Sequence, residues 1–111
     1  MAKSKRRLLV LFNPKDPSDP GAGNTPLGDE AAFFEKLAPY NTGEDSPKRP
    51  GAPTHTLYGP GMSVEYATAQ DPIMQAMVAV NEIDTAFPVL SRLCRELGWK
   101  MQDTDSGQVF G

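Results

Sequence analysis

The residue types that could carry chemistry lie around one turn, Gly59-Pro60-Gly61. His55 and Tyr58 precede this turn and Glu65 follows it, so a hairpin would bring an imidazole close to a carboxylate. General acid–base catalysis by histidine requires such a partner, because the partner fixes the tautomer of the ring. Two glycines beside a proline also allow the backbone to approach another group closely. The predicted ligand-binding residues are therefore His55, Tyr58, Gly59, Gly61 and Glu65.

A simpler interpretation of the same residues stays open beside this one. His55 is the only histidine of the chain and would be a surface residue of a short strand. The glycines around Pro60 would then allow close contact with a neighbouring strand rather than with a ligand. The sequence favours this second interpretation, because it needs no partner for the histidine.

Two other patterns look like ligand sites but lack essential parts. The stretch 103–107 resembles the start of a calcium loop, although it lacks the third ligand residue before the glycine, so a hairpin turn is expected. Cys94 is the only cysteine, which excludes an intramolecular disulfide and a site of several thiolates. It falls on the apolar side of an expected helix, where it would be a buried small hydrophobe. No metal site and no cofactor are predicted.

The elements that must position these residues are clearest in the second half of the chain. Residues 73–80 are almost entirely apolar and predict a central strand. Asp84 is the expected N-cap of a helix over 84–97, whose apolar residues recur at helical spacing up to Gly98. The stretch 99–103 then alternates and predicts a strand, with Trp99 and Met101 on the face that meets this helix.

Shorter elements complete the expected order. Strands are predicted over 54–58 and 62–67, joined by the glycine turn, and the second should pair with the strand over 73–80. Residues 8–12 are apolar throughout and predict a strand that is buried on both faces, or a segment that docks on the core. Thr25-Pro26 resembles an N-cap followed by a proline and predicts a helix over 26–38.

Taken together, these elements predict an α+β fold. If 54–67 forms one bulged strand, the order is β-α-β-β-α-β, which is the ferredoxin-like order, with a mainly antiparallel sheet and both helices on one face. The alternative is a β-β-α-β core with a disordered N-terminal half. The expected organisation is a basic flexible tail over 1–7, a Pro/Gly-rich and partly disordered segment over 8–53, and a compact α+β core over 54–111.

Composition narrows the classes of function. The 111 residues carry a net charge of −3, and eight of the eleven prolines lie in residues 1–53. Positive charge concentrates in Lys3, Lys5, Arg6 and Arg7, whereas residues 54–111 are acidic and would repel a phosphate backbone. No stretch is long and apolar enough to cross a membrane, and no export signal is recognised, so a cytoplasmic location is predicted.

Three hypotheses of function follow. The leading one is a small cytoplasmic module without catalytic activity that binds another protein or a second copy of itself through a sheet face or edge. The alternative is a small enzyme that uses His55, Tyr58 and Glu65 around the Gly59-Pro60-Gly61 turn. The third is a nucleic-acid adaptor that acts through its basic tail.

Overall fold

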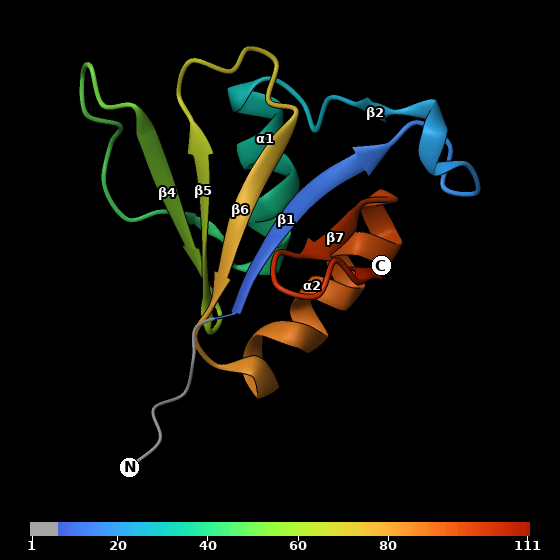
Figure 1. Ribbon diagram of the computed structural model, residues 1–111. Coiled ribbons are helices and arrows are strands. Elements are labelled where there is room, and N and C mark those ends of the chain that lie inside the picture. Colours follow the sequence, from blue (N-terminus) through green and yellow to red (C-terminus); the bar gives the residue numbers. More distant parts are fainter. Residues whose placement is uncertain (1–6) are drawn as a thin grey trace.

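Strand β1 (Arg7–Pro14) runs through the middle of the sheet, between β6 and β7 (Figure 1). The computed structural model, which describes residues 7–111, has an α+β fold with an antiparallel sheet of eight strands and two α-helices. The sheet order is β3-β4-β5-β6-β1-β7-β8, and β2 pairs with the far end of β1. The remaining elements are β2 (Asn24–Thr25), α1 (Glu30–Leu37), β3 (Gly43–Glu44), β4 (Thr54–Gly59), β5 (Met62–Ala67), β6 (Gln75–Val80), α2 (Ile83–Leu97), β7 (Lys100–Asp103) and β8 (Val109–Phe110).

The predicted strands of the second half are confirmed, with small shifts at their ends. β4 and β5 form a hairpin around Pro60-Gly61, in which Gly59 pairs with Met62. β5 then pairs with β6 as expected. Gly61 has a φ of +64°, and a Cβ at this position would meet the Glu82 carbonyl at 2.8 Å. The turn needs glycine because it packs against the segment that leads into α2.

Helix α2 follows the predicted range, but its start differs. Glu82 is the N-cap residue and makes no side-chain capping bond, whereas Asp84 lies within the first turn. The prediction that Asp84 caps the helix is therefore wrong, although its negative charge still suits the helix N-terminus. The end is as predicted, because Gly98 adopts a φ of +75° and donates its N–H to the Cys94 carbonyl at 2.8 Å.

Helix α1 begins four residues later than predicted. Thr25 belongs to β2, and Asp29 is the N-cap, with its carboxylate accepting from the Ala32 N–H at 2.8 Å. The Thr25-Pro26 start is therefore wrong. A carboxylate cap satisfies an otherwise unpaired N–H of the first turn in the same way.

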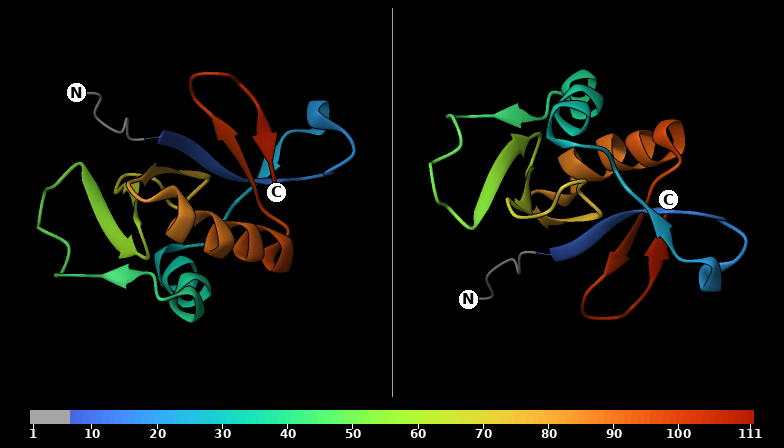
Figure 2. Two further views of the ribbon diagram at one scale, coloured as in Figure 1. Left: turned by 90° about the horizontal axis from the view of Figure 1, so that it is seen from below. Right: turned by 90° about the horizontal axis from the view of Figure 1, so that it is seen from above.

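Both helices lie on one face of the sheet (Figure 2), and the core fills the space between them. Phe33 and Leu37 come from α1, and Leu90, Leu93 and Cys94 come from α2. They meet the side chains that the sheet presents to this side, which we call the inner face. The buried inner-face residues include Leu9, Leu11, Leu57, Met62, Val64, Tyr66, Ala76, Val78, Val80 and Met101. Trp99 and Met101 are buried in this same core, as predicted.

The ferredoxin-like order is not confirmed, because the sheet has more strands than that fold. Strands β6 and β7, which α2 connects, run parallel to each other on either side of β1, which is antiparallel to both. The predicted division at residue 53 stays a prediction. Residues 1–6 of the predicted basic tail, including three of its four charges, lie outside the described residues, and Arg7 opens β1.

None of the helices within residues 7–111 is long and apolar enough to cross a bilayer. The predicted cytoplasmic location stays a prediction.

Candidate functional site

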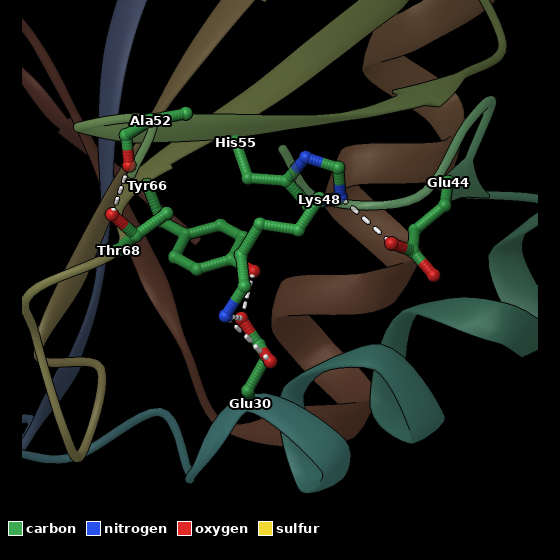
Figure 3. A network of polar contacts seen from close by, with 7 residues as sticks. All are labelled: Glu30, Glu44, Lys48, Ala52, His55, Tyr66 and Thr68. Atoms are coloured by element: carbon green, nitrogen blue, oxygen red, sulfur yellow. Dashed lines mark hydrogen bonds and ion pairs between the residues drawn. The ribbon is translucent and has the colours of Figure 1, made fainter. Parts of the chain in front are cut away.

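His55 lies on the inner face of β4 and is only 9% exposed. Its Nε2 atom is 2.8 Å from Oε2 of Glu44, which lies in the short edge strand β3 (Figure 3). The Tyr66 ring lies against it edge-on, with centroids 5.9 Å apart. The prediction of a surface histidine is therefore wrong, since the ring is buried and has a carboxylate partner.

The register of the β4–β5 hairpin separates the three residues that were expected to share a site. His55 pairs with Tyr66 and points toward the helices. Glu65 pairs with Thr56, and Tyr58 pairs with Ser63, so both point to the opposite side. The predicted contact of His55 with Glu65 is therefore wrong. A catalytic group of His55, Tyr58 and Glu65 does not form, because alternate residues of a strand face opposite sides.

Three groups of polar contacts lie in the region of His55 and join four segments (Figure 3). The Tyr66 hydroxyl donates to Glu30 of α1 at 2.5 Å, and Lys48 forms an ion pair with the same carboxylate at 3.0 Å. Nearby, the Thr68 hydroxyl donates to the Ala52 carbonyl at 2.5 Å. The network holds α1 and the segment 44–52 against the β4–β5 hairpin.

The charges in this network are already satisfied. The Tyr66 hydroxyl and then Lys48 lower the pKa of Glu30, while burial and the Glu30 carboxylate raise the pKa of Tyr66. A carboxylate with a lowered pKa is a weak general base. No buried side-chain N or O atom among the described residues lacks a hydrogen-bond partner. The arrangement is that of a structural network rather than of a reactive centre.

The glycine turn is also explained by the chain itself. The Gly61 carbonyl accepts the N–H groups of Asn81 and Glu82 at 2.8 and 3.0 Å. A Cβ at Gly59 would clash with the Thr42 hydroxyl and approach the end of Met62 at 2.9 Å. Both glycines therefore allow close contact within the protein, which is the simpler of the two interpretations offered by the sequence.

A second polar group joins β1 and β7, and sequence reasoning missed it. Arg7 forms a hydrogen-bonded ion pair with Asp103 at 2.8 Å, and its guanidinium lies 5.2 and 5.4 Å from the ring centroids of Phe87 and Phe110. Arg7 lowers the pKa of Asp103, and two backbone N–H groups of the following turn add to this effect. The stretch 103–107 is thus a hairpin turn, as predicted.

Neither a metal cluster nor a reactive thiol is evident within residues 7–111. No group of three or more His, Cys, Asp or Glu side chains in this range could hold a metal ion. Cys94 is buried, as predicted, and burial raises the pKa of its thiol to about 11. The thiol therefore stays protonated at neutral pH and is a poor nucleophile.

The sheet face opposite the helices, which we call the open face, has an unusual distribution of side chains. The two central strands β1 and β6 present apolar groups there, apart from Gln75 at the start of β6, and the strands beside them present mainly polar ones. The apolar centre consists of Leu8, Val10, Phe12, Met77 and Ala79, with Val109 beside it on β8. The polar margins consist of Thr54, Thr56, Ser63 and Glu65 on one side and Lys100 and Gln102 on the other. Leu8 is 40% and Val109 is 49% exposed.

One end of the open face forms a groove of about 470 Å³. Val10 and Phe12 make its floor, and Lys100 and Val109 flank it. Pro17 and Gly23, from the segment between β1 and β2, form its end wall. Antiparallel sheets with one wet face usually carry polar residues on that face, so the apolar floor is a departure that packing within the described chain does not explain.

Comparison of the chain with models of protein families, with curated proteins and with solved structures gave no significant match.

Proposed function

We propose that this protein is a small binding module that acts through the open face of its sheet. The single observation that carries the proposal is the apolar centre of this face, where Leu8, Val10 and Phe12 of β1 alternate with the buried Leu9 and Leu11 and so point away from both helices. Contiguous apolar surface rimmed by polar residues is typical of protein-interaction sites. The partner in this proposal is a protein.

The inner face supports this proposal by contrast. On the inner face, His55, Tyr66 and Arg7 each have a polar partner within the chain. The open face, in contrast, presents side chains whose burial the described chain leaves incomplete. Binding of a partner would therefore bury more apolar surface on the open face than at any polar cluster of the inner face.

A site-specific photo-crosslinker tests this proposal in the cells from which the protein comes. The crosslinking residue is placed at Val10 on the open face, and at Ser91 on the exposed side of α2 as the control. We expect a covalent adduct with a protein from position 10 and none from position 91. Equal yields from both positions, or no adduct from position 10, would contradict the proposal.

A further inference from the structure

We infer that the occupant of the open face is a second copy of this chain, packed sheet against sheet. This inference rests on the proposed function and names its partner. It is argued from the distribution of apolar and charged side chains over the face and from the symmetry that a dimer imposes.

The face has the composition of a dimer interface. Apart from Gln75 at the start of β6, its centre is apolar over β6 and β1, and the charged strand residues occur only at its margins. Protein interfaces are likewise depleted of charge at the centre and polar at the rim. Two such faces can pack about 10 Å apart, with strand directions within about 30° of each other.

Each margin carries one charged strand residue, and the two are of opposite sign, although Asp16 of the segment between β1 and β2 lines the same groove as Lys100. Glu65 lies on β5, one strand beyond β6, and Lys100 lies on β7, one strand beyond β1. The two residues therefore flank the apolar centre symmetrically. Lys100 donates one hydrogen bond to the Gly111 carbonyl at 3.1 Å, and its ammonium group has two further donors.

A two-fold axis parallel to the strands, placed between β6 and β1, brings these charges together. Such an axis exchanges β5 with β7, so that Glu65 of each copy faces the margin that carries Lys100 of the other. The register places Glu65 level with Val10 and Lys100 level with Phe12. The offset is two residues, or roughly 7 Å along the strand, which two long side chains on crossed sheets can span.

The other two-fold arrangement is unfavourable. An axis perpendicular to the strands would place Glu65 against its own copy and Lys100 against its own copy. Like charges that face each other destabilise an association. The distribution of charge therefore selects a single dimer geometry.

The area of the open face determines how strongly the two copies are expected to associate. Each outward residue of a sheet occupies roughly 33 Å², so about fifteen of them cover about 500 Å². This is smaller than the roughly 800 Å² per partner of a standard interface. We therefore expect a dimer that dissociates in the micromolar range.

Sedimentation equilibrium of the purified chain over a range of concentrations measures this association. Val10→Lys would place an unpaired charge at the centre of the interface in both copies, and it should weaken the dimer by at least about 100-fold. Ser91→Lys adds the same charge to the exposed side of α2 and should leave the dimer unchanged. A wild-type chain that stays monomeric at millimolar concentration would overturn the inference.

A charge exchange tests the geometry itself. Glu65→Lys and Lys100→Glu each place like charges at both margins and should each weaken self-association about tenfold. In a mixed dimer of the two variants, a lysine faces a glutamate at both margins again, which should restore association to within about threefold of wild type. Circular dichroism of each variant checks its folding. Mixed variants that associate no better than each alone would overturn the inference.

The crosslinked adduct from position 10 distinguishes this inference from the proposed function. It also tests the inference in case the Lys100→Glu variant does not fold. An adduct of twice the chain mass supports the second copy. An adduct with a different protein, from a chain that is monomeric in solution, overturns the second copy and leaves the binding module in place. The absence of any adduct overturns the binding module as well.

Discussion

The two faces of strand β1 carry similar side chains but differ in how far they are covered. Leu9 and Leu11 point to the inner face and are completely buried under the helices. Leu8, Val10 and Phe12 point to the open face and stay partly exposed. All five residues are apolar, so the difference comes from what covers each face. An apolar strand residue therefore indicates a position that is buried in the functional protein, but another molecule can be what buries it.

The comparison also shows where polar side chains serve the fold. The inner face contains His55, Tyr66 and Asp103, and each has a defined hydrogen-bond partner. The polar residues of the open face lie mostly at its margins, where water or a partner can reach them. Buried polar side chains of the inner face therefore need hydrogen-bond partners within the chain, whereas exposed polar side chains of the open face can bond to water.

The largest expected effect is the loss of a leucine from the inner face. Leu11→Ala should lower the free energy of unfolding by about 2–5 kcal/mol, because it leaves a cavity under the helices in the middle of the sheet. Guanidinium unfolding followed by Trp99 fluorescence measures this. A loss below about 1 kcal/mol would mean that the inner face is not the core of the protein.

A smaller effect is expected at the edge of the inner face. Tyr66→Phe removes the hydroxyl that donates to Glu30, and it should cost about 1 kcal/mol at pH 7, because the Glu30 carboxylate is partly exposed. The pKa of Glu30 is lowered from its usual value of 4.5. The contribution of the charged carboxylate is therefore complete above that pH and is lost as the pH falls through the lowered pKa.

Urea melts of wild type and Tyr66→Phe at pH 7 and pH 3 test this dependence. The difference between the two proteins should shrink at pH 3. Tyr58→Phe is the matched control, since Tyr58 is 54% exposed on the open side of β4. This control should match wild type at both pH values. If Tyr66→Phe lowered the free energy of unfolding by the same amount at pH 7 and pH 3, the hydrogen bond to Glu30 would not depend on the charge of the Glu30 carboxylate.

The smallest expected effect is on the open face. Val10→Ala should change the stability of the monomer by about 0.5 kcal/mol or less, because its side chain is only partly buried within one chain. The melt is performed at a concentration low enough to keep the chain monomeric. A loss as large as that of Leu11→Ala would show that something within the chain already covers the open face.

The positions of strands and helices were predicted most accurately where several local signals of the sequence agree. The strand over 73–80, the helix over 84–97 and the strand after Gly98 were placed nearly as observed, because apolar periodicity and glycine position indicate the same elements. The start of α1 was misplaced, since Thr25-Pro26 and Asp29 both look like helix starts. The central place of β1 was not predicted, because strand order depends on pairings between residues far apart in the chain.

The candidate site was harder to predict for a related reason. One residue of register decides whether His55 meets Glu65 or Tyr66, and the two-residue turn at Pro60-Gly61 selects Tyr66. Glu44, the actual partner of His55, lies in a two-residue strand that carries no strand signal of its own. The apolar run over 8–12 was the useful signal. It was expected to be buried on both faces, and only one of the two is covered within the described chain.

The central position of β1 also bears on how the chain is made. Synthesis proceeds from the N-terminus, so β1 leaves the ribosome long before β6 and β7, the strands on either side of it. The partner that fixes its first residue is Asp103, which lies 96 residues away from Arg7 in the sequence. Pairings this distant must close a long loop before they contribute any stability. The apolar run of β1 therefore stays without its two main pairing strands until nearly the whole chain has been synthesised.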